Sequence, residues 1–325
     1  MSPRNDPFPR AGNSFATNLA VAAAVSTAVV GAGSFAYGAL VERRNFSLRR
    51  EVLPILPSGS RPLAILHISD MHMAPWQTDK QEWIRSLAVL EPDLIVDTGD
   101  NLGHIDAYDA VEYALEPFRG VPGVFVHGSN DYAGPQRKNW LTYFGGPSRA
   151  HKKPDVLDTG RLTSFLEGLG WLDLNNTARA LEINGSRLEL FGVNDAHRGW
   201  ARLERLPGAL DELRENVGWH DEPGPEPLSI GVTHAPYQRV LNSFVTNGAD
   251  LIFGGHTHGG QVCVPGFGAL VTNCDIPRDK VSGLSTWTHA RRTAQLEVSA
   301  GLGTSIYAPV RFACRPEAVL VTLTA

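Results

Sequence analysis

Short apolar runs alternate with amphipathic segments through the first half of the chain beyond residue 61. The runs at 63–68, 94–96 and 124–126 are apolar enough to predict buried strands. The segments 79–90 and 107–118 between them repeat their apolar positions with the period of an α-helix. This βαβαβ order predicts parallel strands joined by right-handed crossovers.

The second half of the chain changes to a mixed pattern. Residues 179–183 and 187–191 flank Asn184-Gly185, a dipeptide that favours a two-residue β-hairpin and therefore antiparallel pairing. The polar segment 134–160 contains three prolines and predicts a loop-like insert. The remaining predicted elements are helices at 162–169, 200–217 and 237–245 and strands at 228–232, 249–253, 269–272, 294–298 and 318–323.

The N-terminal residues divide into three parts before the globular domain begins. We expect residues 1–14 to form a disordered polar tail, 15–41 an apolar transmembrane or anchor helix, 42–60 a linker, and 61–325 the domain. From Leu19 to Val41 the sequence has no charged residue, a length sufficient to cross a bilayer. A membrane anchor is favoured over a cleaved signal peptide, which would be shorter, and over a buried soluble helix, which would have a polar face.

Arginines on both sides of this helix bear on its orientation. Arg4 and Arg10 precede it, whereas residues 43, 44, 49 and 50 after it are all arginine. The positive-inside rule therefore places the domain in the cytoplasm. A domain exported to the outer side is the alternative.

Composition and charge exclude several classes of function. Of the 325 residues, 42% are hydrophobic and 19% charged, as in an ordinary globular enzyme. The net charge of −5, without a long basic tract, argues against a nucleic-acid partner. Cys263, Cys274 and Cys314 form no C-x-x-C motif, which argues against a zinc finger or a thioredoxin-like site. We expect reduced thiols, although a disulfide between two of them stays open.

Polar side chains of metal-binding types follow five of the predicted strands. Taken singly, each has an ordinary explanation as a helix cap or a turn residue. Together they predict a cluster, because the carboxyl ends of parallel strands meet at one edge of a sheet. Carboxylate, imidazole and amide ligands in this mixture suit manganese, iron or zinc, and a pair of such ions activates water and binds a phosphoryl group. The candidate ligands are Asp70, His72, Asp100, Asn130, His234, His256 and His258.

The order of these motifs, D-x-H, G-D, G-(N)-D, H and G-H-T-H, resembles that of the calcineurin-like metallophosphoesterase superfamily over residues 61–325. Residues 255–262 and 299–316 are similar to the subgroup of membrane-associated bacterial phosphoesterases that includes the YkuE and YaeI proteins. The resemblance implies an α/β fold, a four-layer α/β/β/α sandwich of two mixed sheets. It also implies two metal ions and a bridging hydroxide that attacks phosphorus in line.

The resemblance assigns a role to each candidate ligand. It implies that Asp70, His72 and His258 hold the first ion, that Asp100 bridges, and that the second ion is held by Asn130, His234 and His256.

One motif departs from the family pattern. The family usually has G-N-H followed by an acidic residue, in which the Asn is a ligand and the His donates a proton. This chain has Gly128-Ser129-Asn130-Asp131. We expect Asn130 rather than Ser129 to be the ligand. Asp131, His104 or His197 is a candidate for the missing donor, unless the leaving group needs no proton.

The substrate is less well defined by the sequence. Arg311 is a candidate phosphate contact. A membrane anchor favours a phospholipid or lipid-linked phosphodiester or pyrophosphate, and the subgroup includes enzymes that cleave UDP-diacylglucosamine. The alternatives are a catalytically impaired metal-binding scaffold on the same fold and a phosphomonoesterase.

Overall fold

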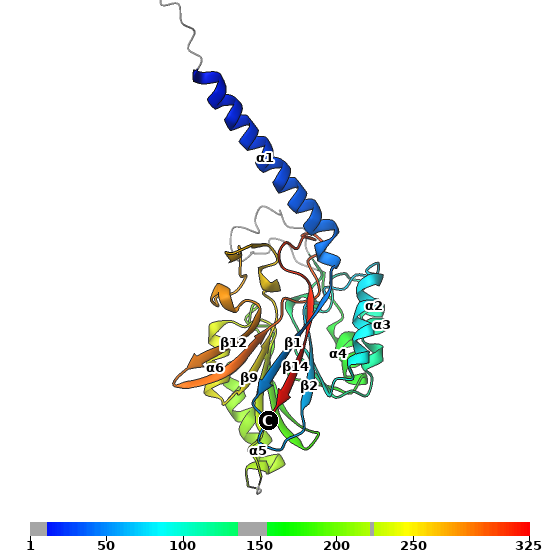
Figure 1. Ribbon diagram of the computed structural model, residues 1–325. Coiled ribbons are helices and arrows are strands. Elements are labelled where there is room, and N and C mark those ends of the chain that lie inside the picture. Colours follow the sequence, from blue (N-terminus) through cyan, green and yellow to red (C-terminus); the bar gives the residue numbers. More distant parts are fainter. Residues whose placement is uncertain (1–11, 136–154, 222–223) are drawn as a thin grey trace, which may run out of the picture.

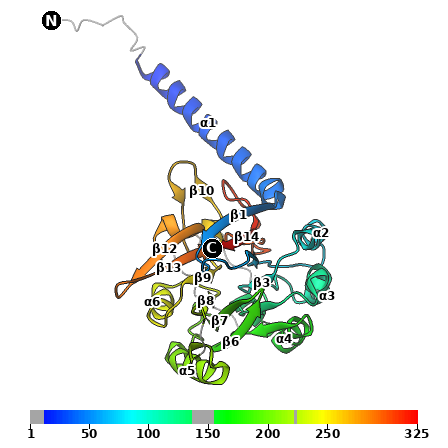
Figure 2. The ribbon, with the colours of Figure 1, turned by 60° about the horizontal axis from the view of Figure 1, so that its bottom comes forward.

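Two mixed six-stranded sheets pack face to face, and helices cover the outer face of each, so that the domain has four layers (Figure 1, Figure 2). The computed structural model describes residues 12–135, 155–221 and 224–325. This architecture confirms the α/β/β/α sandwich that the motif order implies.

The first sheet has the order β1-β14-β2-β3-β4-β5. Its central strands β2, β3 and β4 are parallel, as the βαβαβ pattern predicts, whereas β14 runs antiparallel to β2. The strands are β1 (Ser47–Pro54), β2 (Leu63–Ile68), β3 (Leu94–Asp97), β4 (Gly123–Phe125), β5 (Trp171–Asp173) and β14 (Glu317–Thr324).

The second sheet has the order β12-β13-β9-β8-β7-β6. The predicted hairpin at Asn184-Gly185 joins β6 and β7, and both turn residues have positive φ, 54° and 80°. The strands are β6 (Thr177–Ile183), β7 (Ser186–Val193), β8 (Leu228–Thr233), β9 (Leu251–Gly254), β12 (Gly283–His289) and β13 (Arg292–Val298).

Three buried apolar clusters correspond to the three interfaces between the layers. One lies between the two sheets, where Ile65 and Val96 meet Ile230 and Phe253. The other two lie under the helices of each outer layer. The helices over the first sheet are α2 (Thr78–Ser86), α3 (Tyr108–Leu115) and α4 (Thr159–Gly168), and those over the second are α5 (Leu206–Val217) and α6 (Gln238–Thr246).

The prediction of a linker at 42–60 is wrong for its middle part. Residues 47–54 form β1, which pairs in parallel register with β14 along its whole length. The strand escapes a search for apolar runs because it carries three successive charged residues. One of them, Arg49, is neutralised by Glu297 and Glu317 at 2.7 and 3.0 Å, so its charge is compatible with a position between the sheets.

Smaller differences lie near the C-terminal half. In place of the strand expected at 269–272 there is the two-residue strand β11 (Gly268–Ala269), which pairs with β10 (Cys263–Val264). The strand β12 was not predicted from the sequence. Most of the insert expected at 134–160 lies outside the described residues. The three cysteines are free thiols, as expected.

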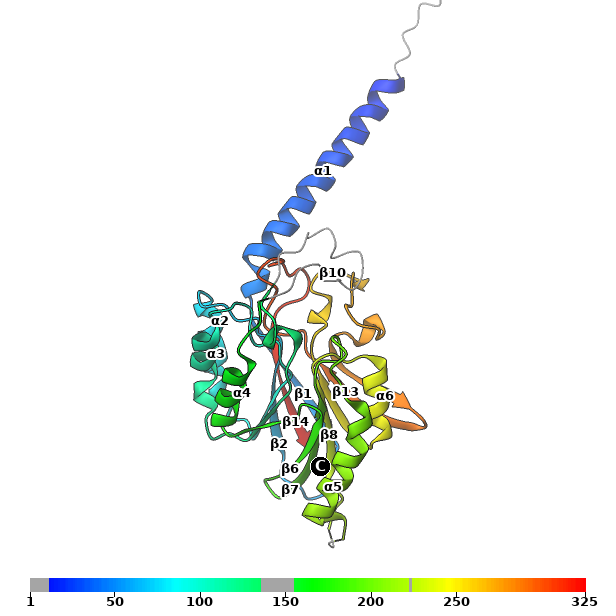
Figure 3. The ribbon, with the colours of Figure 1, turned by 180° about the vertical axis from the view of Figure 1, so that it is seen from behind.

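A single long helix, α1 (Gly12–Leu40), precedes the domain. It is long and apolar enough to cross a membrane, a property that signal sequences and some core helices share. It leaves the domain at the end opposite the C-terminus (Figure 1, Figure 3). Since β14 ends at the C-terminus and is antiparallel to β2, α1 lies at the end where β2 and its parallel neighbours terminate.

Candidate metal centre

All seven predicted ligands lie at the carboxyl ends of strands, on the edge where the two sheets face each other. The first sheet contributes those that follow β2, β3 and β4, and the second contributes those that follow β8 and β9. Asp70 and His234 are fully buried, and His72, Asp100 and His256 are nearly so. The centre is therefore a seam between the sheets, built from residues up to 188 positions apart in sequence.

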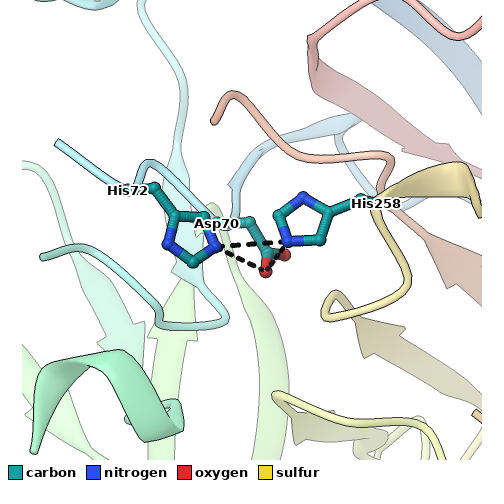
Figure 4. Close-up of side chains that lie close together, drawn as sticks. All are labelled: Asp70, His72 and His258. Carbon is teal, nitrogen blue, oxygen red and sulfur yellow. Dashed lines mark hydrogen bonds and ion pairs between the residues drawn. The ribbon is translucent and has the colours of Figure 1, made fainter. Parts of the chain in front are cut away.

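Asp70, His72 and His258 form the first half of this centre (Figure 4). Oδ1 of Asp70 lies 3.6 Å from Nε2 of His258 and 3.9 Å from Nε2 of His72. The two Nε2 atoms are 3.2 Å apart. Three ligand atoms thus converge on one point, a spacing that a single cation can fill.

Asp100 connects this group to the second half. Its Oδ2 lies 3.5 Å from Nε2 of His72 on one side and 3.5 Å from Nε2 of His234 on the other. Nδ1 of His256 is 3.2 Å from Nε2 of His234. A carboxylate between two groups of imidazoles is the arrangement expected of a bridging ligand.

The chemistry of these atoms fits a cation. Asp70 Oδ1 is buried and has no hydrogen-bond partner among the described residues, although an unpaired buried carboxylate oxygen is costly. Burial lowers the pKa of His72 to about 4 and that of His258 to about 3, so both rings are neutral and have lone pairs to donate.

His234 differs from these two rings. Burial alone would lower its pKa, but the Asp100 carboxylate outweighs that effect and raises the pKa of His234 well above its usual value. The same attraction holds the pKa of Asp100 well below its usual range, against the effect of burial. A cation that binds between them would displace the imidazole proton, because metal ligation requires neutral imidazole.

The backbone at the ligands is bent into an uncommon conformation. Five of the seven have positive φ: Asp70 at 49°, His72 at 39°, Asp100 at 57°, His256 at 64° and His258 at 50°. Residues other than glycine pay a penalty of roughly 1–3 kcal/mol in such regions, and these conformations concentrate at functional sites. The rest of the fold therefore holds the ligands in place before any ion binds.

A family profile described as "Calcineurin-like phosphoesterase" matches residues 63–260, which include every one of these ligands. The chain belongs to the calcineurin-like phosphoesterase family. It is accordingly a metal-dependent phosphoester hydrolase with a candidate dinuclear site.

Several proteins of known sequence resemble this phosphoesterase over most of its length. The "Uncharacterized metallophosphoesterase YkuE" of Bacillus subtilis is 24% identical over 304 residues, 91% of this chain and 92% of that protein. The "Uncharacterized protein YpbG" of the same organism is 29% identical and covers 82% of both chains. Among solved structures, a dimetal phosphatase from Danio rerio is 11% identical over 74% of this chain and 88% of its own, with a TM-score of 0.39.

The motif that departs from the family pattern lies directly against Asp100. The backbone N–H and the side-chain amide of Asn130 donate to Oδ1 and Oδ2 of Asp100 at 2.8 and 2.6 Å. Rotating the amide by half a turn would direct its oxygen toward the centre. Gly128 is required here, since a Cβ on it would lie 2.2 Å from Oδ1 of Asp100.

Asp131, a candidate proton donor from the sequence, has a different environment. Its buried carboxylate accepts hydrogen bonds from the backbone N–H groups of Gly128, Asp100, Asn101 and Leu102, at 2.7–3.2 Å. Both oxygens are occupied by the two loops that carry Asp100 and Asn130. This geometry is that of a residue that positions ligands.

Arg311, the candidate phosphate contact, is fully buried. Its Nη2 donates to the carbonyl oxygens of Ala300, Gly301 and Gly303 at 2.7–3.0 Å and lies 3.5 Å from Nδ1 of His258. The guanidinium therefore clamps a loop behind a metal ligand, and its burial argues against direct contact with substrate.

The two candidate histidines have different surroundings. The ring of His197 is 4.6 Å from that of His256, and its Nδ1 is 2.9 Å from the hydroxyl of Tyr237. His104 packs its ring edge against Trp76 at 5.1 Å, and its Nδ1 accepts from the backbone of Asp106. Of the two, His197 is the one in ring contact with a ligand.

A supporting chain of hydroxyl groups was missed in the sequence. Ser69 donates to Oδ2 of Asp70 at 2.5 Å and accepts from Thr98 at 2.7 Å, and Nε2 of His67 lies 3.0 Å from Thr98. The chain fixes the Asp70 carboxylate from behind. The only signal was position, because each of the three residues lies in or beside a strand end that also carries a ligand.

Proposed function

We propose that this phosphoesterase is a phosphodiesterase or pyrophosphatase that acts on a lipid-linked or other membrane-proximal phosphoester. The observation that carries the proposal is the convergence of seven candidate ligand side chains at the end of the domain from which the apolar helix α1 departs. An anchor in this position would hold the centre close to lipid head groups. A pyrophosphate of the UDP-diacylglucosamine type is one substrate of this class.

In this proposal each half of the seam holds one ion. Asp70, His72 and His258 would hold the first, Asn130, His234 and His256 would hold the second, and Asp100 would be shared between them. Two bound ions, manganese, iron or zinc, supply an activated water molecule and neutralise charge on the phosphoryl group.

His197, whose ring contacts that of His256, is the candidate proton donor to a leaving oxygen near the second ion. Burial raises the pKa of Tyr237 to about 12, so that its hydroxyl keeps its proton and can donate to Nδ1 of His197. Nε2 of His197 would then carry the ring proton. A pyrophosphate or aryl leaving group is also consistent with the proposal, since it leaves without protonation.

We propose that the helix is retained as an anchor. Near its C-terminal end, Gly38 accepts a hydrogen bond from the backbone of Arg311, and Glu42 accepts one from the backbone of Cys314 at 2.7 Å. Cleavage on the C-terminal side of Gly38 would remove the first of these contacts. The arginine-rich flank that follows favours a cytoplasmic domain, with export as the alternative.

The test is hydrolysis of bis-p-nitrophenyl phosphate by the full chain in the presence of Mn²⁺. We expect turnover that chelation abolishes and that Asp100→Asn lowers by at least 100-fold. Asp106→Asn, an exposed aspartate in the following loop, is the matched control and should leave turnover unchanged.

Two outcomes would contradict the proposal. The absence of turnover with manganese, iron and zinc, in protein that binds metal, would favour the scaffold alternative. A higher kcat/KM for p-nitrophenyl phosphate than for the diester would favour a phosphomonoesterase.

A further inference from the structure

An apolar groove of about 670 Å³ separates the C-terminal part of α1 from two loops of the domain. The helix contributes Gly31, Ser34 and Phe35, which share one face at helical spacing. The domain side consists of residues 261–262, which follow the candidate ligand His258, and residues 307–310 and 312. The volume falls in the range of small-molecule binding sites.

A close backbone contact forms the floor of the groove. The N–H of Arg311 donates to the carbonyl oxygen of Gly38 at 3.2 Å, and a Cβ on Gly38 would lie 2.5 Å from the carbonyl oxygen of Arg311. The rings of Tyr37 and Phe312 meet edge to face beside it. The absence of a side chain at Gly38 thus lets the helix approach this loop closely. One helical turn toward the N-terminus, at Ser34 and Phe35, the groove separates the helix from the domain.

The lining suits an apolar occupant. Among the described residues no charged side chain lines the groove, and the one side-chain amide among them, that of Gln261, donates to the carbonyl oxygen of Ala308 at 2.7 Å. A polar ligand would find few partners there, whereas a hydrocarbon chain would remove apolar surface from water.

Neighbouring residues indicate which apolar molecule is suitable. Phe267 is 60% exposed and Val264 is 42% exposed, both in the β10–β11 hairpin at the same end of the domain. The guanidinium of Arg278 lies 4.9 Å from the Phe267 ring centroid, which places a cation beside an exposed aromatic side chain. Aromatic and basic residues together are typical of a surface that contacts lipid head groups.

The groove and the candidate metal centre share a wall. Arg311 lies between Val310 and Phe312 of the groove, and its Nη2 is 3.5 Å from Nδ1 of His258. We propose that the groove binds an acyl chain of a membrane lipid whose phosphoester lies at the metal centre. This inference rests on the proposed function for the phosphoester, but the binding of the chain can be tested by itself.

The binding test uses photo-labelling in vesicles. The full chain is reconstituted in phosphatidylglycerol vesicles that contain a small fraction of phospholipid with a diazirine in its acyl chain, and labelled peptides are mapped after irradiation. We expect label on the segment 307–312 as well as on α1. Ser34→Trp, which fills the groove from the helix, should reduce label on 307–312 at least fivefold.

Ala36→Trp is the matched control, because it adds the same ring to the same helix outside the groove lining. It should leave labelling of 307–312 unchanged. Label confined to α1, or equal label on 307–312 in both variants, would overturn the inference.

A second measurement separates this inference from the proposed function. Dodecyl p-nitrophenyl phosphate and methyl p-nitrophenyl phosphate carry the same reactive group, and we expect kcat/KM to be at least tenfold higher for the dodecyl ester. Ser34→Trp should lower this ratio toward 1, whereas Ala36→Trp should preserve it. Turnover without chain-length preference overturns the groove alone, whereas specific labelling without turnover of any diester overturns the phosphodiesterase proposal alone.

Discussion

Replacing Asp131 with asparagine tests whether this residue positions the ligand loops or donates a proton. In the structure Oδ1 of Asp131 accepts from the backbone of Asn101 and Leu102, and Oδ2 accepts from the backbone of Asp100 and Gly128. An asparagine keeps one acceptor oxygen and turns the other into an NH₂ donor. Two buried N–H groups would then face a donor instead of an acceptor.

The magnitude follows from these contacts. A hydrogen bond to a charged group contributes about 1.5–3 kcal/mol, so losing two costs roughly 3 kcal/mol at the lower limit. Domains of 150–250 residues lose about 2–4 °C of Tm per kcal/mol. We therefore expect Asp131→Asn to lower Tm by roughly 6–12 °C, and to weaken metal retention because the loops that carry Asp100 and Asn130 lose their shared anchor.

The assay combines thermal unfolding, metal content by elemental analysis, and turnover of bis-p-nitrophenyl phosphate normalised to bound metal. Asp106→Asn, with a side chain 75% exposed, is the control and should change none of the three. If Asp131→Asn keeps its Tm and its metal but loses turnover with an altered pH profile, the positioning role is refuted and a proton-transfer role is favoured.

Four further substitutions, which test three points, have definite expected outcomes. Asn130→Ala should lower metal content and turnover more than tenfold, whereas Ser129→Ala should change them less than threefold; the reverse order would make Ser129 the ligand. Arg311→Lys should lower Tm and metal content, because a lysine cannot donate to three carbonyl oxygens and contact His258 together; a raised KM with unchanged Tm would instead indicate a phosphate contact. Burial raises the pKa of Asp195 from 3.8 to about 6, so the folded state binds this proton more tightly than the unfolded chain. The carboxyl therefore costs stability as pH rises from 3.8 through 6. Asp195→Asn should accordingly raise the Tm of chelated protein more at pH 8 than at pH 4.5, and an equal change at both pH values would contradict the shift.

The convergence of the candidate ligands was predictable because each of them combines two local signals. Asp100 and His234, for example, each lie just beyond an apolar run, and each has a side chain able to bind a metal. Parallel pairing then requires the ends of such runs to meet, so their convergence follows from topology without knowledge of side-chain positions.

The roles of Asp131 and Arg311 could not be obtained in the same way. Both have the side-chain chemistry of catalytic groups. Only the structure shows that the Asp131 carboxylate accepts hydrogen bonds from backbone N–H groups and that the Arg311 guanidinium donates to backbone carbonyl oxygens. The strand β1 was missed for a related reason. The charge of Arg49 appears incompatible with an interior position until its carboxylate partners, about 250 residues away in sequence, are known.

The position of the centre on the seam has a mechanical consequence. Asp70, His72 and Asp100 follow strands of one sheet and His234 and His256 follow strands of the other, so any ion bound among them would cross-link the two sheets. Tight binding of an ion to the native state alone adds to the free energy of unfolding by mass action. Loading with metal would thus raise the temperature at which the two sheets separate, and chelation would lower it.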